Sequence, residues 1–327
     1  MQESSLDPQA RAFLDRLAAA GRPPLSTATP VQARAASAML STLCAGPVED
    51  VESVVAREIP GPRGPIGARV YTPAIATDGA LPVLVYFHGG GFVIGDLDMV
   101  DATCRMLANR AACLVVSVDY RLAPEHPYPA PREDAYAATA WVAREAASFG
   151  GDPGRVAVGG DSAGATLSAV VAQIARDEAG PPICFQLLVY PGSDRDMPRD
   201  SMLAFGNDYF LTLDTMRWFQ RHHAGAVPVA RDPYLAPLEA SDFSNLPPAL
   251  VITAGFDPLR DGGELYAERL EAAGVPTELV RYPGMIHGFF VFPAVFDVAR
   301  EAIDRSADAL RRAFAATRPK VGSRPAQ

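Results

Sequence analysis

The sequence predicts an α/β fold in which a mostly parallel sheet of eight strands is flanked by helices. Two observations carry this prediction: short apolar runs rich in β-branched residues recur along the chain, and helical patterns separate the later runs. Strands that alternate with helices indicate βαβ units and therefore parallel pairing. The chain has 327 residues, nearly half of them hydrophobic, which suits one large domain with an accessory element.

The expected elements follow from these runs in chain order. The strands are expected at 51–58, 68–72, 83–88, 114–120, 156–159, 186–190, 250–255 and 278–282. A turn rich in Pro and Gly at 60–64 joins the first two, so we expect an antiparallel hairpin there. The helices are expected at 98–110, 133–148, 163–177, 259–273 and 292–314.

Two regions do not fit this alternation. Two helical patterns within 7–46 begin at Asp-Pro and Thr-Pro, which suit an N-cap followed by proline. Residues 193–240 interrupt the strands with aromatic and apolar side chains. We expect both regions to form a helical cap over the carboxyl ends of the strands, where ligands bind in open α/β sheets; two ordinary packing helices are the alternative. The expected parts are an N-terminal cap segment at 1–50, a core at 51–192 and 241–315, a cap insert at 193–240 and a disordered tail at 316–327.

Composition argues against several classes of function. A formal net charge of −9 disfavours nucleic acid or an anionic membrane surface as partner. The sequence has no stretch of transmembrane length and no signal-peptide pattern, so we expect a cytoplasmic protein without integral membrane association. Its only lysine, Lys320, lies in the tail, which leaves the body without a Schiff-base or phosphate-loop lysine. The four cysteines show no metal spacing, so we expect free thiols, no metal and no cofactor.

The motif Gly-Asp-Ser-Ala-Gly at 160–164 stands between an expected strand and an expected helix. In this context Gly-x-Ser-x-Gly predicts a nucleophile elbow, a sharp turn that exposes the serine hydroxyl. The pattern alone arises by chance in roughly one chain in ten of this length. The alternative interpretation is a glycine-rich turn with a serine that has no catalytic role. Ser162 is therefore a candidate nucleophile that needs partners elsewhere in the chain.

One of the five histidines suits the role of the base. His222 and His223 are adjacent on an expected helix and we expect them to face solvent, while His126 lies in a proline-bracketed loop that favours a structural role. His88 ends a strand and opens a glycine run. His287 follows the last expected strand and is flanked by glycine, which suits a catalytic histidine.

Asp257 is the preferred acid because it follows an apolar strand at a carboxyl edge. Asp261, four residues later, is the alternative, as a charge stabilised at a helix N-terminus. The order Ser162, Asp257, His287 is that of the α/β-hydrolase fold and differs from the chymotrypsin and subtilisin orders.

The run His-Gly-Gly-Gly at 88–91 predicts an oxyanion hole, because glycines let backbone N–H groups converge without side chains in the way. We assign the N–H groups of Gly90, Gly91 and Ala163 as donors. A phosphate-binding loop is the competing interpretation, and the continuation at 92–96 lacks the Lys and Ser/Thr that it requires.

Together these motifs resemble those of the hormone-sensitive-lipase-like carboxylesterases. The resemblance rests on His-Gly-Gly-Gly-Phe at 88–92, the segment 118–126, the serine motif at 160–164, Asp-Pro-Leu-Arg-Asp at 257–261 and His-Gly-Phe at 287–289, and spans about residues 50–310. It implies a cap built from the N-terminal helices and an insert, hydrolysis of short- to medium-chain acyl esters, and the roles already assigned to Asp257 and His287.

Three functions follow as hypotheses: a serine carboxylesterase, an amidase, peptidase or lactonase with the same triad, and a non-catalytic small-molecule receptor. Labelling of Ser162 by a phosphonate separates the enzymes from the receptor, and esters assayed beside an anilide separate the first two. The partner is expected to be a small-molecule ester; a homodimer stays open. The expected pocket residues, with core packing as the alternative, are Phe92, Tyr209, Phe210, Leu211 and Ile286.

Overall fold

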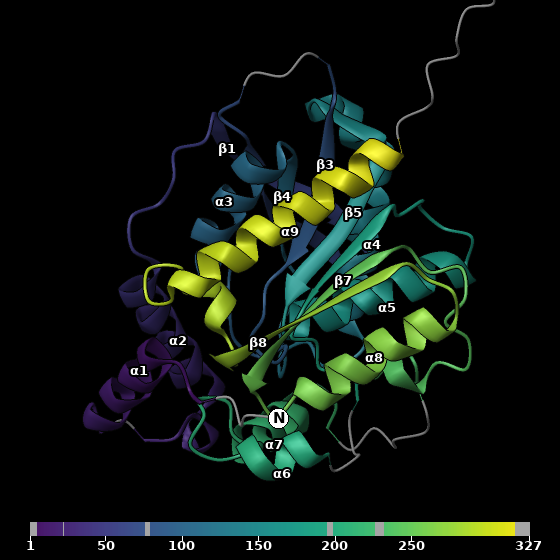
Figure 1. Cartoon of the computed structure of the whole chain (residues 1–327). Helices are drawn as coiled ribbons and strands as arrows, with labels where there is room; N and C mark the ends of the chain where they lie inside the picture. Colours follow the sequence, from purple (N-terminus) through teal and green to yellow (C-terminus); the bar gives the residue numbers. More distant parts are fainter. Residues whose placement is uncertain (1–4, 22, 76–78, 195–198, 226–231, 318–327) are drawn as a thin grey trace, which may run out of the picture.

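A computed structural model describes residues 5–21, 23–75, 79–194, 199–225 and 232–317 of the chain. Within these ranges eight strands form one sheet in the order β1-β2-β4-β3-β5-β6-β7-β8 (Figure 1). The pairs β1–β2 and β2–β4 are antiparallel, and the neighbouring pairs from β4 to β8 are parallel. The predicted fold class and the opening hairpin are confirmed.

The strands are β1 (Ser53–Gly61), β2 (Gly64–Thr72), β3 (Leu81–Phe87), β4 (Leu114–Asp119), β5 (Gly151–Asp161), β6 (Phe185–Val189), β7 (Ala249–Phe256) and β8 (Thr277–Ile286). β5 and β8 are longer than predicted. β8 continues past Tyr282 because it still pairs with β7, with Ile286 opposite Phe256 after an irregularity in the register. The extension places Ile286 in the sheet, where the sequence predicts a loop.

Helices cover both faces of the sheet. α3 (Asp101–Ala111) and α9 (Asp297–Ala316) lie together on one face, and α4 (Ala130–Glu145), α5 (Ala163–Asp177) and α8 (Arg260–Ala272) pack on the other (Figure 1). α9 ends at Ala316, two residues beyond the expected end of that helix. Residues 318–327 of the predicted disordered tail lie outside the described residues.

The remaining α-helices of the described chain gather at one end of the sheet. α1 (Pro8–Ala19) and α2 (Pro30–Ala45) come from the N-terminal region, and α6 (Asp200–Phe205) and α7 (Leu213–His223) from the insert (Figure 1). α1 and α2 begin as predicted: the Asp7 side chain accepts from the N–H of Gln9, and Thr29 forms a capping box with Gln32, each followed by proline. Here "cap" denotes these four helices and their connections.

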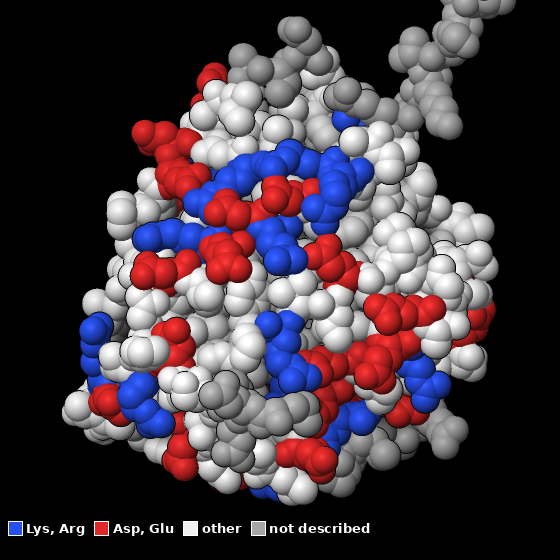
Figure 2. Space-filling view, viewed as in Figure 1, with Lys and Arg blue, Asp and Glu red and all other residues white. Residues whose placement is uncertain are grey.

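Charged side chains on the outer face of α3 and α9 are paired. Figure 2 shows basic and acidic side chains interleaved over this face. Arg110 bridges Glu49 and Asp304, and Arg305 of α9 pairs with Glu278 of β8.

Within the described residues, no helix combines the length and the apolar character that crossing a bilayer requires.

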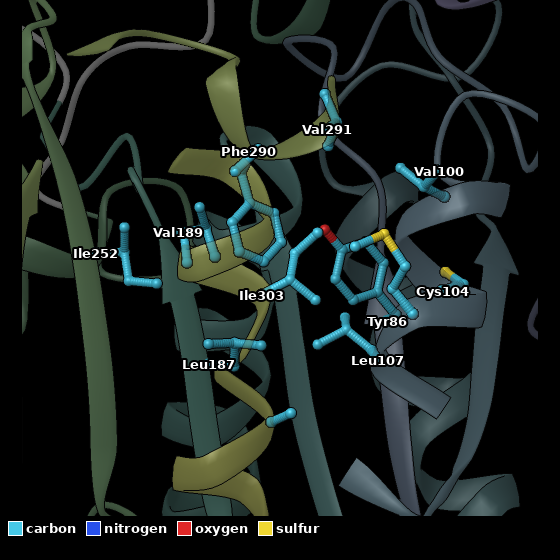
Figure 3. Close-up of a cluster of buried hydrophobic side chains, with 14 of the residues drawn as sticks. Tyr86, Val100, Cys104, Leu107, Leu187, Val189, Ile252, Phe290, Val291 and Ile303 are labelled. Carbon is cyan, nitrogen blue, oxygen red and sulfur yellow. The ribbon is translucent and has the colours of Figure 1, made fainter. Parts of the chain in front are cut away.

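The largest apolar cluster lies between the sheet and the helices α3 and α9. Leu187 of β6 is fully buried there, in one cluster with Tyr86 of β3 and Ile303 of α9 (Figure 3). Burial of such side chains supplies much of the driving force for folding, and a cavity in a close-packed core is costly.

We expect Leu187→Ala to lower the free energy of unfolding by about 2–5 kcal/mol, because it removes buried methyl groups and leaves a cavity. Urea denaturation followed by circular dichroism measures the change. Leu279→Ala on β8 is the matched control, since Leu279 is 38% exposed and should cost much less. Equal losses in the two variants would contradict the placement of the core.

Candidate active site

Ser162 stands at the turn between β5 and α5 in a strained backbone conformation. Its φ of 52° and ψ of −119° lie in a region that residues with a side chain rarely adopt. Its N–H donates to Val189 O at 2.9 Å, which ties the turn to the neighbouring strand β6. The nucleophile elbow predicted from the sequence is thus present in the backbone geometry.

The two glycines of the motif are required by close packing against β3. A Cβ atom on Gly164 would lie 1.8 Å from the carbonyl oxygen of Phe87, and one on Gly160 would lie 2.3 Å from the same oxygen. The positive φ falls on Ser162 itself. The glycines therefore let the end of β3 approach the elbow, while the serine carries the strain.

Ser162, His287 and Asp257 form a hydrogen-bonded chain. His287 Nε2 lies 2.9 Å from Ser162 Oγ, and His287 Nδ1 lies 2.7 Å from Asp257 Oδ2. An ionised carboxylate only accepts hydrogen bonds, so Nδ1 carries the proton and Nε2 is left to accept from the serine hydroxyl. This is the tautomer that a general base needs.

The surroundings hold both partners of the serine in place. Asp257 is fully buried, and its Oδ1 accepts from the N–H of Leu259 at 2.8 Å. The ring of Tyr190 packs against the His287 ring with centroids 4.6 Å apart. The alternative acid, Asp261, instead accepts from the N–H of Ser201 and pairs with Arg260, at the start of α8. The geometry therefore brings Asp257, and not Asp261, to the histidine.

The glycine run at 88–91, here called the oxyanion loop, turns sharply beside Ser162. Gly90 and Gly91 have φ values of 113° and 58°, which favour glycine. Gly90 O accepts from the N–H groups of Val93 and Ile94, which closes the turn. Within the described residues, no hydrogen bond is donated by the N–H groups of Gly90, Gly91 or Ala163, and all three residues line the cavity above Ser162.

His88 supports this loop from inside the core. Its ring is fully buried, stacks on Tyr120 with centroids 4.4 Å apart, and places Nδ1 2.7 Å from Gly89 O. Tyr120 Oη donates to His88 O at 2.7 Å. Burial lowers the pKa of His88, so the neutral ring is favoured and acts as a structural support.

A cavity of about 420 Å³ lies above the serine, between the sheet and the cap. Its floor is formed by the oxyanion loop, the elbow and His287. α2 contributes Ser37 and Leu40, and the insert contributes a larger, mainly apolar wall that includes Met216 and Phe219 of α7. Cavities of this size suit small organic ligands.

The family of the chain follows from comparison with known proteins. Residues 84–291 match the family model described as the alpha/beta hydrolase fold. The chain belongs to the α/β hydrolase family. The predicted resemblance of this hydrolase to hormone-sensitive-lipase-like carboxylesterases is confirmed.

The α/β hydrolase is 49% identical to esterase LipI of Mycobacterium tuberculosis over 81% of this chain and 83% of that relative. It is 36% identical to an ethyl acetate hydrolase of Pseudomonas putida, over 94% of this chain and 99% of that relative. Among solved structures, the ester-hydrolase EH1AB1 from the metagenome of Lake Arreo, in complex with a bipyridine phosphonate derivative, superposes with a TM-score of 0.92. It is 44% identical, over 95% of this chain and 99% of that one.

Of the five residues predicted to line the pocket of the hydrolase, Phe92, Phe210 and Leu211 do so. The prediction is wrong for the other two, which lie outside the cavity lining. Tyr209 packs on Phe256 and Phe205, with centroids 5.3 and 5.5 Å apart. Ile286 is fully buried in the main core, because β8 extends through it.

The expectation that His223 faces solvent is also wrong. It is 6% exposed, lines the cavity, and stacks on Phe92 with centroids 3.9 Å apart. It shares one face of α7 with Met216 and Phe219, which also line the cavity. The spacing of 216, 219 and 223 is that of one helix face, so helical periodicity could have found this wall of the pocket.

The cap contacts both the oxyanion loop and residues that follow it in the chain. Arg34 of α2 donates through Nε to Val93 O and through Nη2 to Ala123 O, both at 2.8 Å, and pairs with Glu125. Phe219 of α7 lies against Gly91, where a Cβ atom would be 2.2 Å from its ring. In the part of the chain that is described, no group of three or more His, Cys, Asp or Glu is placed to hold a metal ion.

We expect Gly164→Ala to destabilise this hydrolase by about 3 kcal/mol and to abolish its activity, because the added methyl would meet the backbone of Phe87, which cannot turn aside. Urea unfolding and an ester assay measure the two effects. Gly154→Ala is the control, since its Cβ would approach only the Asp152 side chain, at 3.3 Å. A Gly164→Ala variant with normal stability would refute the packing argument.

Proposed function

We propose that this chain is a serine carboxylesterase that hydrolyses short- to medium-chain carboxylic esters through an acyl-enzyme on Ser162. The hydrogen-bonded chain from Ser162 through His287 to Asp257, at the floor of a largely apolar cavity, is the observation that carries the proposal. The chain is an enzyme of the ester hydrolase class, in keeping with its family and with relatives named esterases.

In the acylation step, Ser162 Oγ attacks the ester carbonyl while His287 Nε2 takes the serine proton. Asp257 stabilises the imidazolium that forms, because its fully buried carboxylate accepts from Nδ1 at 2.7 Å. His287 then delivers the proton to the alcohol oxygen, and the alcohol leaves the acyl group on Ser162. The base and the acid are therefore the same residue in successive steps.

Charge on the carbonyl oxygen is stabilised by the N–H groups of Gly90, Gly91 and Ala163. Such donors are each worth about 10²–10³ in turnover. Ala163 opens α5, so its N–H also carries the positive end of the helix dipole. Water then attacks the acyl-enzyme by the same route, with His287 again as base, and releases the acid.

The size of the cavity supports the assignment of substrate length. Its volume of about 420 Å³ is shared by the acyl and alcohol parts of an ester, and aromatic residues such as Phe92 and Phe210 form part of its walls. Short and medium acyl chains fit such a space. A cytoplasmic location and a homodimer stay predictions from the sequence.

Ser162→Ala should lower turnover of p-nitrophenyl butyrate by at least ~10⁴, because no other group can form the acyl-enzyme. Stopped assays of turnover and mass spectrometry after treatment with an organophosphonate measure the loss of activity and of labelling. Ser306→Ala is the control, since its hydroxyl bonds only within α9, to Ala302 O. Retention of most activity in Ser162→Ala would contradict the assignment of the nucleophile. A wild-type chain that the organophosphonate does not label would favour the hypothesis of a non-catalytic receptor.

A panel of p-nitrophenyl esters from acetate to palmitate, with an anilide beside them, tests the substrate class. We expect kcat/KM to peak at short or medium chains and to fall by at least about tenfold at palmitate, where the chain exceeds the cavity. The anilide should be slower than its ester, since its nitrogen is a poorer leaving group. A maximum at palmitate or on the anilide would contradict the proposal.

A further inference from the structure

Asp161, the residue before the nucleophile, carries a buried carboxylate that the mechanism above does not use. The residue is 3% exposed. Its Oδ1 accepts from Tyr86 Oη at 3.0 Å and from the N–H of Gly89 at 3.1 Å. The second bond joins the end of β5 to the oxyanion loop, one residue before the proposed donor Gly90.

We propose that Asp161 is a positioning residue for ester hydrolysis: its carboxylate fixes the oxyanion loop through Gly89, and its negative charge favours the His287 imidazolium that forms during the reaction. This inference rests on the proposed function, because it assigns Asp161 a part in acyl transfer at Ser162. It is distinct from the part of Asp257, which contacts His287 directly.

Packing shows that the loop is built around this carboxylate. A Cβ atom on Gly89 would lie 2.3 Å from Asp161 Oδ2 and 3.2 Å from its Cγ. Gly89 is therefore glycine because the carboxyl group occupies that space, whereas Gly90 meets the carbonyl of Ile94 and Gly91 meets Phe219. Each of the three glycines thus leaves room for a different neighbour, and the neighbour of Gly89 is the carboxyl group of Asp161.

The electrostatic surroundings of Asp161 contain neutral hydroxyl and thiol groups and one group that gains positive charge. No arginine among the described residues pairs with it. Four titratable groups other than His287 interact with the Asp161 carboxylate, and they are Tyr86 of β3, Cys104 of α3, Tyr120 after β4 and Tyr190 after β6. His287 in turn is bonded to Asp257, which follows β7. Protonated His287 is thus the nearby cation that can balance the charge.

Keeping this charge lowers the stability of the fold. Burial raises the pKa of Asp161 to about 6 from its ordinary value of 3.8. Because the pKa in the folded state lies above that of the unfolded chain, this group stabilises the fold below about pH 4, and the contribution is lost as pH rises through 6. At pH 8 the buried charge of Asp161 lowers the free energy of unfolding, whereas a neutral amide of the same shape would not.

The test compares Asp161→Asn and Asp161→Ala with the wild type at pH 8 and across the pH profile of kcat/KM, with p-nitrophenyl butyrate. Asp161→Asn keeps an acceptor for Gly89 and loses the charge. We expect kcat to fall about tenfold at nearly constant KM, the acid limb to move to lower pH, and Tm at pH 8 to hold or rise. Asp161→Ala also loses the acceptor, and its kcat should fall about 10²-fold.

Asp134→Asn is the matched control, because Asp134 is also a fully buried carboxylate but pairs with Arg121. It should lower Tm and leave the acid limb in place. The inference is overturned if Asp161→Asn has wild-type kcat and pH profile, or if its kcat falls only in step with Tm as a structural role requires. A wild-type enzyme without ester turnover and without phosphonate labelling would overturn the proposed function instead, and this inference with it.

Discussion

The close approach of the end of β3 to the nucleophile elbow is the constraint on which the rest of the site depends. The carbonyl of Phe87 lies where a Cβ atom of Gly160 or Gly164 would stand, and the parallel register places Phe87 opposite Gly160. The oxyanion loop begins one residue after Phe87. Its distance from Ser162 is therefore set by close backbone packing between two central strands.

Two buried aspartates, Asp257 and Asp161, place negative charge in the region of His287. Asp257 accepts from the ring and selects its tautomer, while Asp161 precedes the proposed nucleophile and accepts from the N–H of Gly89 in the proposed oxyanion loop. A negative charge near an oxyanion is unfavourable unless donors intervene. The N–H of Gly89 and the hydroxyl of Tyr86 donate to Asp161 and offset part of its negative charge, which leaves the later N–H groups of the loop for the substrate in the proposed mechanism.

The proposed catalytic residues could be brought together from the sequence because each directly follows an apolar strand, and the carboxyl ends of parallel strands share one edge of the sheet. The pocket was less predictable. Ile286 was misplaced because the strand was expected to end at Tyr282, and pairing with β7 carries it further. His223 was misplaced because the pair of histidines was judged alone, without the spacing of Met216, Phe219 and His223 that puts these side chains on one helix face. Local patterns specify the order of the strands, whereas pairing with β7 decides how far β8 extends.

The cap and the core together hold the oxyanion loop from opposite sides. From the core, Asp161 bonds to Gly89 and His88 packs on Tyr120. From the cap, Phe219 covers Gly91 and Arg34 bonds to the carbonyl of Val93. Because the same α7 face also lines the cavity, a ligand that shifts Phe219 would also move the ring that lies against Gly91, whose N–H we propose as an oxyanion donor. In the proposed mechanism, the fit of the substrate and the position of this donor therefore both depend on the Phe219 ring.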